Sequence, residues 1–191
     1  MFESLGISKN MLPSVAGTFH GTLIICGSGR CVWDDLKKVE AQYLDIMAIN
    51  DMIAYLPFKM RHAFSNDHHT LMYWKRCRRN EYRPLDDKVF LHSSTQTPSI
   101  IGWPWPCHGT SALNACYTGL AFGYDEIILA GVPMDDSGHF FSPPYEKSNF
   151  HNEVPYREDG TMKYWANAKN NVFQGKVKSL SGRTKDLLGE P

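Results

Sequence analysis

The sequence predicts an α/β fold with a Rossmann-like parallel sheet and helices on both of its faces. Two observations carry this prediction: short apolar runs of strand length alternate with longer amphipathic stretches, and the apolar runs end in glycine or small polar residues. The chain of 191 residues fits one domain of ordinary size, roughly 100–200 residues. We therefore expect residues 1–191 to form a single α/β domain.

Apolar runs mark the expected strands. The clearest are Thr22–Cys26 (TLIIC), which is rich in β-branched residues, and Glu126–Ala130 (EIILA). The expected strands cover residues 22–26, 45–49, 61–65, 88–92, 126–130 and 176–180. Their alternation with helical stretches is the βαβ rhythm of a parallel sheet.

The connecting stretches have helical spacing. Residues 32–42 repeat apolar side chains at this spacing, and Thr110 begins a buried helix of small and apolar residues that Gly123 ends. Further helices are expected around residues 71–74, over residues 162–173 and after residue 184.

A proline and tryptophan segment (GWPWP, residues 102–106) interrupts this pattern. It cannot be regular helix, because each proline lacks a backbone donor. Trp103 and Trp105 either cover the core of the domain or pack against a neighbouring subunit, which leaves a homo-oligomer open.

The charge balance excludes several function classes. Lysine plus arginine and aspartate plus glutamate each number 20, so no net field draws the chain to nucleic acid or an anionic membrane. The basic run at residues 75–79 reads as a solvated helix end. No apolar run approaches the roughly 20 residues of a membrane span, and the first residues lack the order of a secretory signal. We therefore expect a cytoplasmic protein that does not bind nucleic acid.

The cysteines favour reduced thiols. There are 5, an odd number, and none forms a CxxC pair. This pattern is typical of a cytosolic chain and argues against a disulfide framework or a cysteine-based zinc site.

Small polar residues follow the expected strands where ligands bind in open α/β sheets, beyond the carboxyl ends of the strands. They supply donors and acceptors without filling the space of a ligand, although each could simply close a turn or cap a helix. Those we assign to a nucleotide site are Gly27, Ser28, Gly29, Arg30, Asn50, Asp51, Asn66 and Asp67.

The turn from Gly27 to Arg30 is the strongest element of this group. Glycines let backbone amides approach an anion at the start of a helix, and Arg30 adds a charged donor. Val32 occupies the place of the third glycine in the dinucleotide fingerprint, and the chain has no GxxxxGK[ST] motif. The alternative is a glycine turn with a surface arginine.

A second element lies at the start of the predicted buried helix. Thr110 or Ser111 can cap this helix, while spare amides and a hydroxyl face the site. His108 could orient a phosphate or a carboxylate, or act as an acid, and could equally be an ordinary loop histidine.

A long loop over about residues 131–160 has the composition of a lid. It is rich in proline, glycine, aspartate and asparagine, and its aromatic residues, Tyr145 among them, could close over a bound base or sugar. A histidine in such a loop suits general-base chemistry, with His151 as first choice and His139 as second. Either histidine could instead be solvated.

Four motifs together resemble the compact bacterial sialyltransferases that use CMP-sialic acid. The matching segments are Cys26–Arg30 (CGSGR), Ile49–Asp51 (IND), Thr110–Ala112 (TSA) and Gly123–Gly131 (GYDEIILAG). The same signature is similar to the archaeal 6-hydroxymethylpterin diphosphokinase-like family, which shares this Rossmann-like core. Ala112 and His108 depart from the sialyltransferase pattern, which has a glycine and an arginine there.

The resemblance implies a nucleotide held between the glycine turn, Asn50, Asn66 and the turn at Thr110 and Ser111. It also implies a lid tyrosine that stabilises the leaving phosphate and a histidine that deprotonates the acceptor hydroxyl, without a metal. The nearest candidates for these two roles are Tyr145 and His151.

Our leading hypothesis is a transferase that passes a sugar from a nucleotide-activated donor, with CMP favoured, to a hydroxyl acceptor that the sequence does not identify, without any cofactor. One alternative is pyrophosphoryl transfer from ATP, in which Asp51, Asp67 or Asp135 would ligate Mg²⁺. Another is a non-catalytic nucleotide-binding module.

Overall fold

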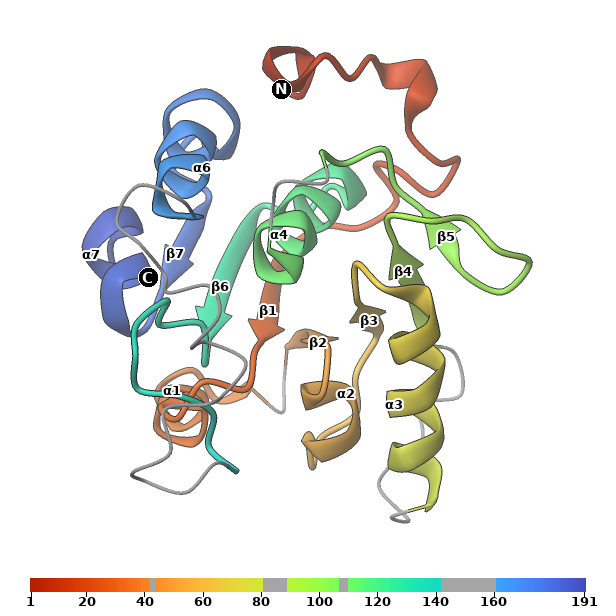
Figure 1. Cartoon of the computed structure of the whole chain (residues 1–191). Helices are drawn as coiled ribbons and strands as arrows, with labels where there is room; N and C mark the ends of the chain where they lie inside the picture. Colours follow the sequence, from red (N-terminus) through yellow and green to blue (C-terminus); the bar gives the residue numbers. More distant parts are fainter. Residues whose placement is uncertain (42–43, 81–88, 107–109, 142–160) are drawn as a thin grey trace.

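A parallel sheet forms the centre of the molecule. The computed structural model describes residues 1–41, 44–80, 89–106, 110–141 and 161–191. Seven strands in this part of the chain pair in the order β5-β4-β3-β2-β1-β6-β7, all of them parallel (Figure 1). They are β1 (Thr22–Cys26), β2 (Asp45–Ile49), β3 (His62–Phe64), β4 (Phe90–Ser93), β5 (Ile101–Gly102), β6 (Glu126–Ala130) and β7 (Val177–Ser179).

Helices cover both faces of this sheet, as predicted. On one face pack α1 (Val32–Lys38), α2 (Met52–Tyr55) and α3 (His68–Asn80). On the other pack α4 (Ser111–Phe122), α6 (Thr161–Ala168), α7 (Gly182–Leu188) and the N-terminal segment. The predicted Rossmann-like α/β fold is therefore confirmed.

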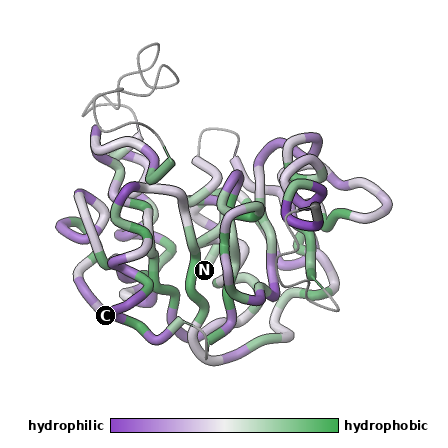
Figure 2. The backbone as a smooth tube through the Cα atoms, turned by 90° about the horizontal axis from the view of Figure 1, so that it is seen from below, coloured by the Kyte–Doolittle hydropathy of each residue, from purple (hydrophilic) through white to green (hydrophobic). Residues whose placement is uncertain are grey.

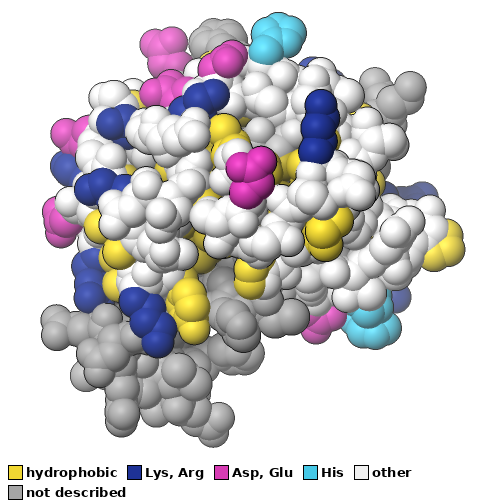
Figure 3. Space-filling model, turned by 90° about the horizontal axis from the view of Figure 1, so that it is seen from above, with side chains coloured by type: hydrophobic (Ala, Val, Ile, Leu, Met, Phe, Trp, Pro, Cys, Tyr) yellow, Lys and Arg dark blue, Asp and Glu magenta, His cyan; other side chains and the backbone are white. Residues whose placement is uncertain are grey.

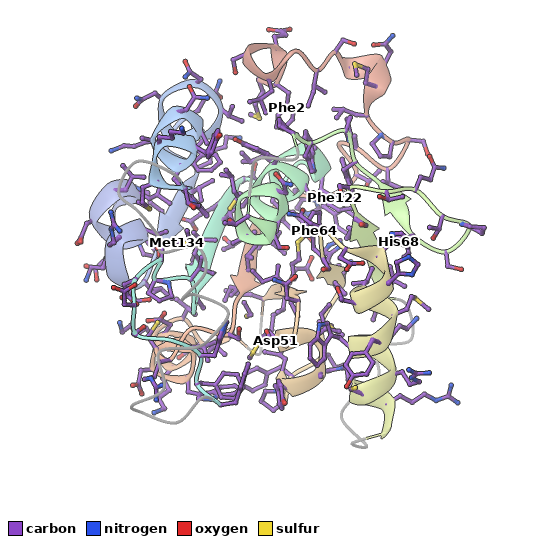
Figure 4. All side chains as sticks on the ribbon, in the orientation of Figure 1. Phe2, Asp51, Phe64, His68, Phe122 and Met134 are labelled. Atoms are coloured by element: carbon purple, nitrogen blue, oxygen red, sulfur yellow. The ribbon has the colours of Figure 1, made fainter. Side chains whose placement is uncertain are left out.

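Side chains that alternate along the strands build two separate cores. In β1, Leu23 and Ile25 face the α4 side, whereas Ile24 and Cys26 face the α1 side, and all four are completely buried. This is why the strands read as continuous apolar runs. Figure 2 shows hydrophobic residues concentrated in the interior of the molecule, and Figure 4 shows Phe64 of β3 and Phe122 of α4 close together on the α4 side of the sheet.

Most predicted elements occur close to their expected bounds. The strands predicted at 22–26, 45–49 and 126–130 match β1, β2 and β6 residue for residue. Helix α4 ends at Gly123 as predicted and is capped by Thr110, one of the two predicted candidates. The two-residue β5 and the four-residue α2 were not predicted. Both are too short for hydrophobic periodicity to reveal them.

Trp103 and Trp105 lie in the core of the domain. They are 1% and 4% exposed, and their rings stack with centroids 5.4 Å apart. Phe2, from the N-terminal segment, packs on Trp105 at 5.1 Å. The tryptophan pair therefore covers this domain's own core, the first of the two interpretations of residues 102–106.

One part of the basic run is not a solvated helix end. Arg78 is 1% exposed and donates hydrogen bonds to the carbonyl oxygens of Leu56 and Phe58. The guanidinium thus satisfies backbone acceptors just beyond α2 and ties α3 to it. The interpretation of residues 75–79 as a solvated helix end is wrong at this position, because a helix has a buried face even within a run of cations.

Charges of both signs are interspersed on the face of the molecule shown in Figure 3, in keeping with the balanced composition. Among the described residues there is no helix with the length and apolar character needed to cross a bilayer.

A continuous hydrogen-bonded chain runs through the core on the α4 side. Trp103 Nε1 lies 3.2 Å from His92 Nδ1, His92 Nε2 lies 3.2 Å from His62 Nδ1, and His62 Nε2 lies 2.9 Å from the Tyr124 hydroxyl. The Tyr124 hydroxyl donates in turn to Asp45 Oδ2 at 2.8 Å. This chain links β5, β4 and β3 to the starts of β6 and β2.

Candidate functional site

A pocket of ≈ 130 Å³ opens at the carboxyl end of the sheet. It lies where the strand order reverses, because β1 has β2 on one side and β6 on the other. Such switch points are where open α/β sheets bind ligands. The pocket is lined by the ends of β1, β2 and β6 and by the start of α4, through Gly27, Ser28, Gly29, Ile49, Asn50, Thr110, Ser111, Ala112, Gly131, Val132, Pro133, Met134, Asp135, Gly138 and His139.

Seven of the predicted site residues line this pocket, namely Gly27, Ser28, Gly29, Asn50, Thr110, Ser111 and His139. Four others lie outside its lining, namely Arg30, Asp51, Asn66 and Asp67. His108, Tyr145 and His151 fall outside the residues that the structure describes.

The start of α4 has the features of an anion-binding site. Thr110 caps the helix, and its Oγ1 accepts a hydrogen bond from the Leu113 amide at 3.2 Å. The amides of Ser111 and Ala112 belong to the first turn, where they have no acceptor inside the helix, and both residues line the pocket. The positive end of a 12-residue helix therefore meets the pocket wall.

The glycine turn has a different role from the one expected. The amides of Gly27, Gly29 and Arg30 donate to the carbonyl oxygens of Ala130, Gly131 and Gly138 at 2.8, 2.8 and 3.0 Å. These three amides are therefore not available to an anion, and the prediction that the Gly29 amide binds a phosphate is wrong. The turn contributes the Ser28 side chain to the pocket instead.

The close approach of two backbone segments explains the glycines. A Cβ at Gly29 would lie 2.7 Å from the carbonyl oxygen of Gly131 and 2.5 Å from Pro133 Cδ. A Cβ at Gly27 would lie 2.6 Å from the same oxygen. Both glycines let β1 and the segment after β6 meet without side chains between them.

Arg30 is also committed to this segment. Its Nε donates to the carbonyl oxygen of Ser137 at 2.8 Å, and its amide bonds to Gly138. The side chain thus helps to hold residues 137–138 over the turn rather than lining the pocket.

A polar network supports the pocket from the β2 and β3 side. Asn50 has a left-handed backbone (φ 51°), and its Oδ1 accepts a hydrogen bond from Ser65 Oγ at 3.0 Å. The Asn66 amide donates to Ser111 Oγ at 3.3 Å, and Asn66 Oδ1 accepts from Asn114 Nδ2 at 3.0 Å. Asn66 therefore joins β3 to the start of α4.

Asn114 supports the pocket through its hydrogen bond to Asn66, and the sequence did not reveal this role. It is 1% exposed, and its Oδ1 is buried with no hydrogen-bond partner among the described residues. Its signal was an amide side chain in a helix otherwise made of small and apolar residues. A buried polar group of this kind indicates a functional or orienting role.

The three aspartates proposed as Mg²⁺ ligands do different things. Asp67 Oδ1 accepts from the His69 amide at 2.8 Å and so caps α3. Asp135 Oδ1 accepts from the Ser137 amide at 2.9 Å and lines the pocket. In the described ranges we find no cluster of three or more histidine, cysteine, aspartate or glutamate residues that could hold a metal.

His139 meets the glycine turn directly. Its Nδ1 lies 2.7 Å from Ser28 Oγ, His139 and Gly29 form an antiparallel bridge, and the Phe140 amide donates to the Ser28 carbonyl oxygen at 3.0 Å. The ring is thus fixed to the pocket wall by both backbone and side chain.

Asp51 lies between the end of β2 and the start of α2, at the carboxyl end of the sheet (Figure 4). Burial raises the pKa of Asp51 above its ordinary value, and the Ser28 hydroxyl and the charge of His139 offset only part of this rise. Asp51 Oδ1 is buried and has no hydrogen-bond partner among the described residues. Asp51, Ser28 and His139 therefore form one interacting group.

Aromatic rings hold the segment that carries His139. Phe140 packs edge-on against Trp33 of α1 at 5.1 Å and Tyr55 of α2 at 5.4 Å. Phe141 stacks on His139 with centroids 5.1 Å apart and an interplanar angle of 5°. Phe140 thus anchors the segment to the helices beneath.

Comparison with known proteins gives one result of value for the fold. No family model matches the chain, and no curated protein matches it. A solved structure of the sialyltransferase CST-II in complex with CMP is similar, with a TM-score of 0.59, 16% sequence identity, and coverage of 88% of this chain and 85% of that one. At this identity the likeness shows a shared sialyltransferase-like fold.

Proposed function

We propose that this chain is a sialyltransferase-like glycosyltransferase that passes a sugar from a CMP-activated donor to a hydroxyl acceptor. The observation that carries the proposal is the convergence, on one pocket at the β1–β6 switch point, of the start of α4 with the Ser28–His139 pair. The similar fold of a sialyltransferase that binds CMP supports the donor class.

The donor phosphate binds at the start of α4 in this proposal. The amides of Ser111 and Ala112 and the Ser111 hydroxyl are the donors, and the helix dipole favours the negative charge. Charge develops on the phosphate as it leaves, so donors fixed in advance lower the barrier. This arrangement supplies electrostatic stabilisation from the chain itself, and no cofactor is part of the proposal.

Asn50 and Asn66 hold the nucleoside. Asn50 lines the pocket at the end of β2, and Asn66 is oriented by Ser111 and Asn114. Amide side chains offer both donors and acceptors, which suits ribose hydroxyls and a pyrimidine edge.

The transfer step needs a base for the acceptor. The acceptor oxygen attacks the anomeric carbon, the bond from that carbon to the phosphate oxygen breaks, and the phosphate keeps the electron pair. The acceptor proton passes to a histidine. His139 is favoured because it lines the pocket; His151 as the base and Tyr145 as a partner of the leaving phosphate remain proposals from the resemblance.

Nucleotide binding is the first test. A thermal-shift screen over CMP, UDP, GDP and ADP, with and without Mg²⁺, should show selective stabilisation by CMP, of about 2.7 kcal/mol at a hundredfold excess over the dissociation constant. Release of CMP from CMP-sialic acid should persist in a strong chelator. CMP release that the chelator abolishes would contradict transfer without a metal. Mg²⁺-dependent transfer of pyrophosphate from ATP, with no CMP release, would favour the diphosphokinase-like alternative, and tight binding without turnover would favour a non-catalytic module.

Removal of one amide tests the phosphate site. Ala112→Pro deletes a first-turn donor without breaking a hydrogen bond inside the helix, and Ala112→Gly keeps the donor as the matched control. We expect the proline variant to weaken CMP binding by about tenfold, the value of one charge-assisted hydrogen bond, and the glycine variant to bind nearly as wild type. Equal affinity in both variants would contradict binding at α4.

A further inference from the structure

Asp51 is half-buried, and one of its two carboxylate oxygens is left without a donor from the described part of the chain. Its Oδ1 receives no hydrogen bond from any described residue, and it lies at the start of α2, outside the pocket lining. A buried charged oxygen is costly unless a donor or a positive charge compensates it. The groups that favour the charged form are, in decreasing order, the Ser28 hydroxyl, the His139 ring and the backbone amides of Met52 and Asp51.

The single hydroxyl proton of Ser28 sets the donor and acceptor roles among Asp51, Ser28 and His139. In its ionised form the Asp51 carboxylate can only accept, so the hydrogen bond between the two groups directs the Ser28 proton to Asp51. Ser28 Oγ then acts as the acceptor in its 2.7 Å contact with His139 Nδ1, which must carry the proton of that hydrogen bond. With the proton on Nδ1, the lone pair of the ring is on Nε2.

We infer that Asp51 is a positioning residue that acts through Ser28 to hold His139 as its Nδ1–H tautomer. The catalytic meaning rests on the proposed function: Nε2 accepts the proton of the acceptor hydroxyl, and the resulting imidazolium is stabilised by the Asp51 carboxylate across Ser28. Asp51 takes no proton itself. The contact joins residues 111 positions apart, and the Gly29–His139 bridge fixes its geometry.

Nitrogen-15 NMR of histidine-labelled protein at about pH 8 tests the tautomer directly, with His139 assigned from the signal that His139→Gln removes. Wild type should show the Nδ1–H form. Asp51→Ala frees the Ser28 hydroxyl to donate to Nδ1, so the ring should change to Nε2–H. Asp51→Asn keeps an acceptor oxygen and should restore Nδ1–H. The control is Asp136→Ala, which removes an exposed aspartate three residues before His139 and should leave the tautomer unchanged.

Ser28→Ala provides a second route should the Asp51 variants fold poorly, because it removes the link and should also deplete Nδ1–H. An Nε2–H ring in wild type, or an unchanged ring in both Asp51→Ala and Ser28→Ala, would overturn the inference. These spectra need no turnover, so they remain decisive even when the proposed transferase activity is absent.

Kinetics separates positioning from nucleotide binding. Asp51→Ala should lower kcat by about a hundredfold, the lower range for general-base catalysis, with little change in CMP affinity. A large loss of CMP affinity with an unchanged tautomer would instead make Asp51 a nucleotide ligand and refute the positioning role.

Discussion

The Trp103 indole donates a hydrogen bond to His92 Nδ1 across 3.2 Å, and this contact sets the protons of the whole buried chain. Indole has a donor and no acceptor, so His92 Nδ1 must accept and His92 must carry its proton on Nε2. His62 then accepts at Nδ1 and donates from Nε2 to Tyr124, which donates to Asp45. Both histidines are neutral in this arrangement.

The two neutral histidines of this hydrogen-bonded chain predict that the protein loses stability in mild acid. Burial, with a smaller contribution from the charge of Arg61, lowers the pKa of His62 from 6.5 to about 3. Burial, and then the charge of His62, lowers the pKa of His92 well below 6.5. Because the unfolded chain binds these protons more readily, stability is complete above the unfolded pKa and falls as the pH drops toward the folded pKa.

The expected loss between pH 6.5 and about pH 5 is about 2 kcal/mol for His62, with a further loss from His92, and urea unfolding at a series of pH values measures it. His92→Gln is the informative variant, because glutamine can accept from Trp103 and donate to His62 without titrating. Its pH dependence should be shallower by one proton. A free energy of unfolding that is flat between pH 7 and 5 in wild type would contradict neutral, buried histidines.

Tyr124→Phe should cost about 1–3 kcal/mol of stability at neutral pH. Tyr124 is 1% exposed, and without its hydroxyl His62 Nε2–H loses its acceptor and Asp45 Oδ2 loses its donor. Asp45 keeps its ion pair with Arg61 at 2.8 Å, so the strand start should remain in place. Thermal unfolding measures the change.

Tyr73→Phe is the control for this variant, since that side chain is 49% exposed and lies outside the buried hydrogen-bonded chain. It should change the melting temperature little. Equal melting temperatures for wild type and Tyr124→Phe would show that the buried hydrogen-bonded chain does not contribute to stability.

Gly29→Ala should destabilise the protein by about 1–3 kcal/mol and weaken CMP binding. The new Cβ would lie 2.5 Å from Pro133 Cδ and 2.7 Å from the Gly131 carbonyl oxygen, so the turn and the segment after β6 must separate. Their separation moves Ser28 and His139 apart. Chemical denaturation and CMP titration measure the two effects.

Gly175→Asn is the matched control, because a Cβ there meets no atom within 4 Å and asparagine tolerates its left-handed backbone. It should leave CMP affinity unchanged. A Gly29→Ala protein with wild-type stability and affinity would contradict the role that we assign to close backbone contact.

The fold could be predicted because its signals are local. The caps at Thr110 and Gly123 and the apolar runs of β1, β2 and β6 all lie within short windows of sequence. The predicted strand ends also located the pocket at the carboxyl edge of the sheet, because parallel strands place their carboxyl ends together.

The chemistry of the site could be predicted only in part, since it depends on contacts between distant residues. The glycine turn suggested exposed amides, but those amides pair with residues 130–138, more than a hundred positions later. The Ser28–His139 contact is of the same kind. Asn114 was overlooked for another reason, because an amide within a small-residue helix gives no periodic signal.

Phe140 links the candidate base to the helices beneath it, which leads to a last prediction. Its ring contacts Trp33 and Tyr55 edge-on, and its amide donates to the Ser28 carbonyl oxygen. Phe140→Ala removes the ring and keeps the amide, so the segment should lose its anchor while CMP still binds at the start of α4. We expect kcat for sugar transfer to fall by about tenfold to a hundredfold, because small displacements of a base are costly.

Phe140→Leu retains most of the apolar contact and should recover most of the rate. Comparison of kcat with the CMP dissociation constant in both variants separates positioning from binding. A fall in CMP affinity that matches the fall in kcat would mean that the aromatic contacts shape the nucleotide pocket itself. Loss of rate in both variants, with CMP affinity intact, would mean that the aromatic ring has a role that bulk alone cannot fill, such as its edge-on contacts with Trp33 and Tyr55.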